Sequence, residues 1–325
     1  MKQIIRLFPE HYAPLLRKQV NWDITQEIRL RVNKALEVVD GNGVKTIANG
    51  VVSSSDLSFV LNQVSQFSVY KFKEEMKEGF ITIEGGHRVG LAGKANVNNS
   101  VVETLKNITF MNIRVAHDHI DNAKGIIPYL FSESRWLSTL IIGPPHSGKT
   151  TVLRNISRWI GSGNTFSQSA KVCIVDERSE LAACREGIPQ MDVGNRTDVM
   201  DSCPKSVGMM MMIRSMSPEV LIVDEIGGME DAAAVKEAVN TGVQVICSVH
   251  GEGLTTVKRR KDVGPLLDDE VFDRYVILER LKAISSYYLT VLDRHGKQMV
   301  KVKGEGNDGM VRGPDRTSRY NVGRV

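Results

Sequence analysis

Residues 143–150 of the chain read Gly-Pro-Pro-His-Ser-Gly-Lys-Thr and follow directly on the apolar run 137–142. This spacing matches the phosphate-binding loop, in which a buried strand leads through a glycine-rich turn into a helix. The turn exposes backbone N–H groups, and the N-terminus of the helix adds its positive dipole end. A chance match in a surface loop is the alternative, but the strand-like run before the motif argues against it. We therefore predict an α/β fold that binds a nucleoside triphosphate here.

The motif suggests a role for each of its residues. Lys149 is expected to reach the β- and γ-phosphates of ATP, and the Thr150 hydroxyl to ligate Mg²⁺. ATP and Mg²⁺ are thus the expected cofactors. The residues predicted to contact the nucleotide at this loop are Gly143, Pro144, Pro145, His146, Ser147, Gly148, Lys149, Thr150 and Thr151.

A second apolar run, residues 219–225, ends in the adjacent acids Asp224 and Glu225. A parallel strand brings such side chains to the edge of the sheet where the phosphate loop also emerges. We predict that Asp224 holds Mg²⁺ together with Thr150, and that Glu225 orients and deprotonates the attacking water. A core strand that merely ends in acids is the alternative. The paired carboxylates favour a hydrolase, and the sequence has no Asn-Lys-x-Asp stretch that would recognise guanine.

Two more apolar runs end in polar residues. Residues 172–180 contain Asp176 and Glu177, either of which is a candidate catalytic acid; a helix-capping surface cluster is the alternative. Residues 243–250 end in His250. We predict that this side chain contacts the γ-phosphate and reports its loss, with a purely structural histidine as the alternative.

The spacing of the elements predicts two domains. Hairpins around residues 41–43 and 79–93, a helix over 56–67 capped by Ser55 or Asp56, and a strand over 108–115 indicate a small α+β domain. Beyond it, short apolar strands alternate with helical stretches, which is typical of a parallel sheet covered on both faces. A hairpin over 287–302 is expected to lie beyond that core. The predicted divisions are 1–116 (α+β domain), 117–123 (linker), 124–303 (RecA-like P-loop NTPase domain with a parallel central sheet) and 304–325 (basic, disordered tail).

The composition is that of a soluble globular protein, with 42% hydrophobic and 25% charged residues and a formal net charge of +4. No apolar run approaches the roughly 20 residues that span a bilayer, so we expect no direct membrane span. The four cysteines show no Cys-x-x-Cys spacing, which favours a reduced, cytoplasmic protein. Residues 258–261 are the clearest basic run, and this argues against a nucleic-acid partner.

The order of the segments 143–150, 172–180, 214–227 and 242–251 resembles the phosphate loop, Asp box, Walker B strand and His box of type II and type IV secretion ATPases. On this resemblance Asp176 or Glu177 corresponds to the Asp-box acid, Glu225 to the catalytic glutamate and His250 to the His-box residue. The chain departs from the pattern in having His146 and Asp224 where glycine is usual. It also lacks the proline that usually follows the Asp-box acids.

The first domain extends the resemblance. Residues 85–90 and 112–115 are similar to the arginine-bearing strands of that family's N-terminal domain, which implies that Arg88 and Arg114 contact the nucleotide on domain closure. Five segments resemble the stage III sporulation AA family of endospore-forming bacteria more closely: 27–32, 80–93, 112–117, 174–180 and 217–228. This resemblance implies a self-assembled ring, expected to be a hexamer. It also implies a docking partner in the membrane on the mother-cell side, and a channel toward the forespore that the ring energises.

Three other functions compete with an ATP-hydrolysing motor. A RecA-like nucleic-acid motor would need basic loops with aromatic residues, for which residues 258–261 are the candidate. A scaffold that binds nucleotide without turnover would use the same phosphate loop. A small-molecule kinase fits least, because no arginine-rich lid segment follows the loop.

Overall fold

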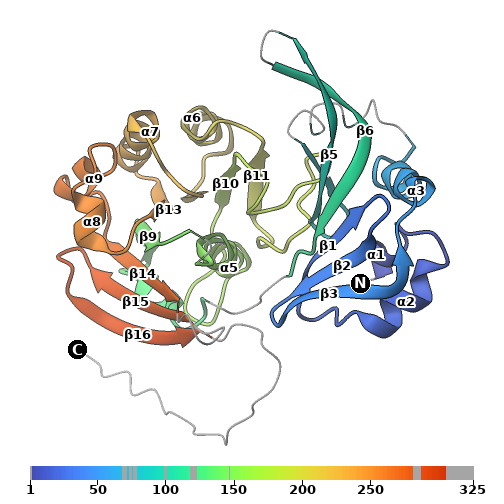
Figure 1. The fold of residues 1–325 in the computed structure, drawn as a ribbon. Coiled ribbons are helices and arrows are strands. Elements are labelled where there is room, and N and C mark those ends of the chain that lie inside the picture. Colours follow the sequence, from blue (N-terminus) through green and yellow to red (C-terminus); the bar gives the residue numbers. More distant parts are fainter. Residues whose placement is uncertain are drawn as a thin grey trace, which may run out of the picture.

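The computed structural model describes residues 2–67, 72, 75, 79–98, 101–117, 123–145, 147–280 and 287–304. The described chain forms two main sheets, one built from residues before 117 and one from residues after 123, which lie beside each other (Figure 1). The predicted linker falls largely outside the described residues. Of the predicted tail, only Gly304 is described.

The first sheet is antiparallel and has six strands in the order β3-β2-β1-β6-β5-β4. Its buried face packs on three short helices around a core that includes Tyr12, Leu16, Leu57 and Ile113. The strands are β1 (Thr25–Arg31), β2 (Ala35–Asp40), β3 (Gly43–Val51), β4 (Phe80–Ile83), β5 (His87–Asn98) and β6 (Val101–Arg114); the helices are α1 (Lys2–Ile5), α2 (Tyr12–Gln19) and α3 (Ser54–Val64).

The start of α3 differs from the prediction. The cap is Ser53, whose hydroxyl accepts a hydrogen bond from Asp56 N–H while the Asp56 carboxylate accepts one from Ser53 N–H. This is a reciprocal capping box, so Asp56 is its third helical residue and not the cap. The sequence signal was the spacing of Ser53 and Asp56, which the apolar pattern of the helix obscured.

β5 and β6 are much longer than the sequence predicted. They continue as a two-stranded ribbon to Asn98 and from Val101, and the ribbon projects away from the body of the molecule (Figure 1). Residues 92–98 are all exposed, so this part of β5 has no buried face. Without a buried face, no alternation of apolar and polar residues marks the strand.

The second sheet has eight strands in the order β11-β10-β12-β13-β9-β14-β15-β16, parallel from β11 to β14 and antiparallel beyond. The α/β P-loop fold with a mostly parallel sheet is therefore confirmed. Its strands are β9 (Thr139–Gly143), β10 (Val172–Asp176), β11 (Thr197–Asp201), β12 (Val220–Val223), β13 (Gln244–His250), β14 (Arg274–Arg280), β15 (Tyr287–Asp293) and β16 (Gln298–Gly304).

Helices cover both faces of this sheet (Figure 1). Successive residues of β9 point to opposite faces, so that Ile141 packs with α5 and Ile142 packs into the core beneath the other helices. The helices are α5 (Lys149–Ser162) on one face, and α6 (Lys205–Met216), α7 (Met229–Asn240), α8 (Leu254–Lys258) and α9 (Gly264–Asp268) on the other.

The structure corrects the expected edges of the sheet. The terminal hairpin β15–β16 does not lie beyond the core, because β15 pairs with β14 over seven residues and so continues the same sheet. β11 and β14 were not predicted. β11 is a partly exposed edge strand that carries Asp198 and Asp201 and so lacks an apolar run, whereas residues 275–278 of β14 are a buried apolar run that could have been found.

His87, at the start of β5, makes the stability of the first sheet depend on pH. Its ring is 5% exposed, and Nδ1 accepts a hydrogen bond from Ala116 N–H at 3.0 Å. Burial lowers the pKa of His87 from its ordinary 6.5 to about 4. Since the folded pKa lies below the unfolded one, stability is lost as the pH falls from about 6.5 toward 4. The difference between these two pKa values corresponds to about 3 kcal/mol of unfolding free energy.

We expect His87→Asn to flatten this dependence, because the asparagine oxygen can accept the same N–H but does not titrate. Urea unfolding at pH 7 and pH 5 measures the change in unfolding free energy for both proteins. His295→Asn, in an exposed turn, is the matched control and should keep the wild-type dependence. An equal loss of stability in wild type and His87→Asn would rule out His87 as the titrating group.

Candidate nucleotide-binding site

The phosphate-binding loop connects β9 to α5. Gly148 caps α5 with a φ of +99°, a left-handed conformation that favours glycine. Gly143, at the end of β9, is needed for close packing, because a Cβ there would lie 2.7 Å from Ser147 Oγ and 2.9 Å from Leu278 Cβ. Pro144, Pro145 and Thr151 also lie in the loop and in the first turn of α5, whereas His146 is outside the described residues. The two glycines thus set the path that the motif requires.

Lys149 is buried, with 6% of its surface exposed. Its ammonium group donates hydrogen bonds to Gly143 O at 3.1 Å, to Pro144 O at 2.9 Å and to His250 Nδ1 at 2.9 Å. Burial lowers the pKa of Lys149, while the nearby carboxylates of Asp224 and Glu225 act to raise it. The lysine is therefore held over the loop by partners that a phosphate could replace.

Asp224 follows β12 and links helix α5 to strand β13 through its two carboxylate oxygens. Its Oδ2 accepts a hydrogen bond from Thr150 Oγ1 at 2.5 Å, and its Oδ1 accepts one from Ser248 Oγ at 2.6 Å. The Ser248 hydroxyl in turn accepts the N–H of Glu225 at 2.9 Å. Ser248 thus sets the position of both acids, a role that the sequence analysis did not assign to it.

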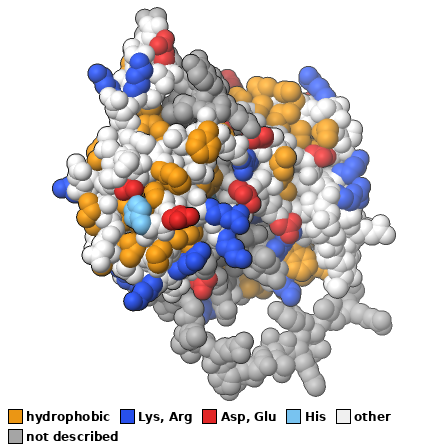
Figure 2. Space-filling model, turned by 90° about the vertical axis from the view of Figure 1, so that its right-hand side faces the viewer, with side chains coloured by type: hydrophobic (Ala, Val, Ile, Leu, Met, Phe, Trp, Pro, Cys, Tyr) orange, Lys and Arg blue, Asp and Glu red, His pale blue; other side chains and the backbone are white. Residues whose placement is uncertain are grey.

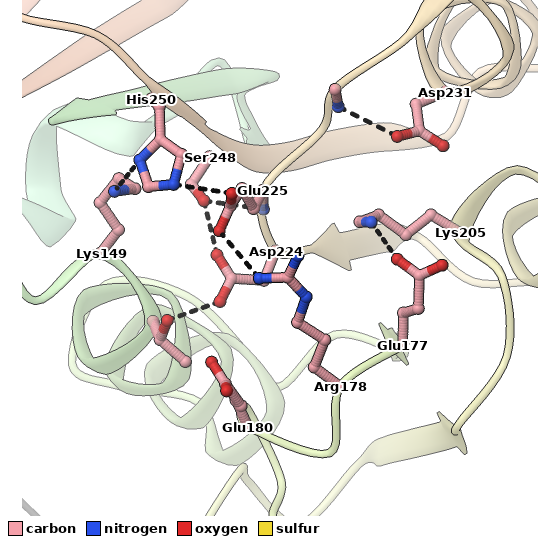
Figure 3. A network of polar contacts seen from close by, with 12 residues as sticks. Lys149, Glu177, Arg178, Glu180, Lys205, Asp224, Glu225, Asp231, Ser248 and His250 are labelled. Carbon is pink, nitrogen blue, oxygen red and sulfur yellow. Dashed lines mark hydrogen bonds and ion pairs between the residues drawn. The ribbon is translucent and has the colours of Figure 1, made fainter. Parts of the chain in front are cut away.

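Glu225 has a left-handed backbone, with a φ of +51°, which turns its carboxylate toward β13. His250 Nε2 lies 2.7 Å from Glu225 Oε1, and Arg178 Nη1 lies 3.7 Å from Oε2 (Figure 3). Because His250 Nδ1 faces the ammonium group of Lys149, Nδ1 is the acceptor and Nε2 carries the proton donated to Glu225. A continuous polar chain therefore runs from Lys149 through His250 to Glu225.

The donor set suits a magnesium–triphosphate complex. Ser147 Oγ is buried and has no hydrogen-bond partner among the described residues, which leaves one hydroxyl available inside the loop. Thr150 and Asp224 offer the hydroxyl and carboxylate oxygens that Mg²⁺ prefers. The residues that the structure describes include no cluster of three or more His, Cys, Asp or Glu side chains placed to hold a metal. Phosphate oxygens and water molecules are the ligands that would complete an octahedral Mg²⁺ site here.

The two candidate Asp-box acids both have partners outside the phosphate loop. Asp176 is 2% exposed and accepts hydrogen bonds from the N–H groups of Glu180 and Ala182 at 2.8 and 2.9 Å. Its burial raises the pKa of the carboxyl group. Glu177 forms an ion pair with Lys205 and lies away from Glu225 (Figure 3). The expectation that Asp176 could face a nucleotide is corrected, because its carboxylate is committed to the backbone of the following loop.

Arg88 and Arg114 are register partners on β5 and β6. Arg88 pairs with Glu180 at 2.8 Å and donates a hydrogen bond to the carbonyl oxygen of Arg178. The first sheet therefore contacts the loop that follows β10 of the second sheet. Arg114 is exposed. Both line a cavity of about 1040 Å³ between the first sheet and this loop. The described residues of the phosphate loop are not among those that line this cavity.

Two solved structures share the fold. The pilus retraction motor PilT with bound ADP matches with a TM-score of 0.59 at 14% identity, over 92% of this chain and 83% of that one. The Legionella pneumophila ATPase DotB matches with a TM-score of 0.56 at 14% identity, over 83% and 77%. Fold and phosphate-binding loop together define the class of this chain, an α/β protein of the P-loop fold.

Sequence comparison places the chain more narrowly. The family described as "Sporulation stage III, protein AA" matches residues 1–299. Stage III sporulation protein AA of Bacillus subtilis (strain 168) is 42% identical over 309 residues, which cover 94% of this chain and 99% of that protein. The chain belongs to the sporulation stage III, protein AA family. The uncharacterized protein ycf45 of Porphyra purpurea is 23% identical over 90% of this chain and 50% of its own length.

None of the helices in the described ranges combines the length and the hydrophobicity that crossing a bilayer requires. On the side of the molecule shown in Figure 2, lysine and arginine side chains are interspersed with acidic and hydrophobic ones.

Proposed function

We propose that the chain is a Mg²⁺-dependent ATPase. The observation that carries the proposal is the convergence of Lys149, Thr150, Asp224, Glu225 and His250 at one edge of the sheet. Lys149 and the backbone of the loop would bind the phosphates, and Thr150 with Asp224 would hold Mg²⁺, which neutralises phosphate charge when bound.

The chemistry assigned to Glu225 is the activation of water. Glu225 orients a water molecule and accepts its proton as the oxygen bonds to the γ-phosphorus and the bond to the bridging oxygen of ADP breaks. The Nε2–H group of His250 donates a hydrogen bond to the other carboxylate oxygen and keeps Glu225 in place. Products are ADP and inorganic phosphate, and the hydrolysis needs no further reactant.

We further propose that hydrolysis drives a motor of the secretion-ATPase type. Arg88 and Arg114 lie on the first sheet and face the cleft, so closure of the two sheets over ATP would bring them toward the phosphates. From the family to which the chain belongs, we infer that the free energy of ATP hydrolysis drives a channel between mother cell and forespore. The chain would act as a cytoplasmic ring, expected to be a hexamer, docked on a membrane protein on the mother-cell side.

ATP hydrolysis by the purified full-length protein, measured against protein concentration, tests this function. We expect Mg²⁺-dependent phosphate release whose rate per subunit rises with concentration, because a ring assembles by mass action. Binding of ATP without turnover would contradict the motor and favour a nucleotide-gated scaffold. Stimulation by single-stranded DNA at low salt would instead favour a nucleic-acid motor.

A further inference from the structure

The loop of residues 177–182, which follows β10, is held rigidly at several points. Asp176 accepts hydrogen bonds from two of its N–H groups, at 2.8 and 2.9 Å. Arg154, on the helix that begins at the phosphate loop, donates to two of its carbonyl oxygens at 2.6 and 2.7 Å. The Ser179 hydroxyl donates to Asp201 at 2.5 Å. The backbone of this loop is therefore fixed relative to the phosphate loop.

Arg178 is the side chain that this rigid loop directs toward the site (Figure 3). Its side chain is 66% exposed, and its guanidinium lies at 3.7 Å from Glu225, a loose ion pair. His250 holds the other oxygen of the same carboxylate at 2.7 Å. Glu225 can therefore lose Arg178 and keep its orientation.

The first sheet contacts the backbone of the same residue. Arg88 donates to the carbonyl oxygen of Arg178, pairs with Glu180 at 2.8 Å and stacks over the Phe80 ring, whose centroid lies 4.4 Å away. The Arg88 side chain is only 14% exposed. Arg88 of the first sheet thus holds the carbonyl group of Arg178, while Asp176 and Arg154 hold the loop around it. The exposed guanidinium of Arg178 can still change its direction.

We propose that Arg178 is an arginine supplied within the same chain that distinguishes ATP from ADP. It pairs with Glu225 in the arrangement seen here and transfers to the terminal phosphate when ATP binds. The proposal rests on the proposed ATPase function. A terminal phosphate carries more charge than a carboxylate and accepts two parallel N–H bonds from a guanidinium, so it competes well for an exposed, loosely paired arginine. The transfer also frees one oxygen of Glu225 for the attacking water.

The test compares the binding of two nucleotides to the full chain. Dissociation constants for Mg²⁺–AMP-PNP and Mg²⁺–ADP are measured by calorimetric titration for wild type, Arg178→Ala and Arg178→Lys. Arg135→Ala is the matched control, since Arg135 is exposed and contacts Gln244 and Asp273 at the opposite edge of the sheet. Thermal unfolding of each variant accompanies the titrations, and the exposed position of Arg178 predicts little change.

We expect Arg178→Ala to weaken AMP-PNP binding about tenfold and to change ADP binding by less than about twofold, because only the γ-phosphate contact is lost. Arg178→Lys should recover part of the preference, since it keeps the charge without the paired N–H groups. Equal changes for the two nucleotides, or none, would overturn the inference while leaving the ATPase function intact. A wild-type protein that binds neither nucleotide would overturn both.

Discussion

Glu225→Gln is expected to bind ATP with nearly wild-type affinity and to hydrolyse it about 10² to 10⁴ times more slowly, the usual contribution of a positioned general base. Glutamine keeps the shape of the side chain and can still accept the hydrogen bond from His250, which in wild type spans 2.7 Å. It cannot accept a proton from water. The groups expected to bind the phosphates are the loop backbone and Lys149, and they do not include Glu225, whose charge acts on Lys149 only through space and through His250.

Phosphate release under single-turnover conditions and equilibrium nucleotide binding separate these two effects. Glu230→Gln, exposed in the first turn of α7, is the matched control and should behave as wild type. Wild-type turnover by Glu225→Gln would remove Glu225 from the catalytic role. Loss of binding together with turnover would show that the residue supports the shape of the site instead.

Lys149→Ala is expected to weaken ATP binding about 10- to 150-fold. The ammonium group offers three donors at the centre of the loop, and charged hydrogen bonds of this kind contribute about 1.5 to 3 kcal/mol. The substitution also removes the donor that faces His250 Nδ1, so the orientation of that ring is less defined and turnover falls further.

Fluorescence titration with a labelled ATP analogue measures the change in affinity. Lys258→Ala, which removes an exposed lysine of α8 paired with Asp268, is the control and should leave the affinity unchanged. Because Lys149 is buried, the unfolding free energy is measured in parallel to show that the variant is folded. Unaltered affinity in a folded Lys149→Ala protein would contradict the assignment of the phosphate loop.

The sequence could predict the parts of the site that follow directly from strand ends. Lys149, Asp224 and His250 each stand at or just after the carboxyl end of a buried apolar run, and parallel strands bring such ends to one edge. The same reasoning failed for Asp176, which also ends an apolar strand. Its carboxylate turns back to cap its own loop, and that direction depends on the backbone after the strand and not on residue type.

Arg178 and Ser248 escaped prediction for a related reason. In the sequence, Arg178 stands next to the candidate acids Asp176 and Glu177, and Ser248 lies within the apolar run that ends in His250, so neither is marked by a motif. Their roles depend on the left-handed turn at Glu225 and on the packing of Arg154 against the loop after β10. Contacts of this kind join residues tens of positions apart, for which one sequence carries no local signal.

The P-loop fold, the phosphate loop and the strand ends that carry Asp224, Glu225 and His250 can be predicted from the amino-acid sequence alone. These features depend on hydrophobic periodicity and on local turn geometry, which are encoded over a few consecutive residues. The burial of Asp176, the approach of Arg178 to Glu225 and the way in which the hairpin β15–β16 completes the sheet are visible only in three dimensions. These outcomes depend on side-chain directions and long-range packing, where burial and hydrogen bonding select one arrangement among several that the local sequence allows.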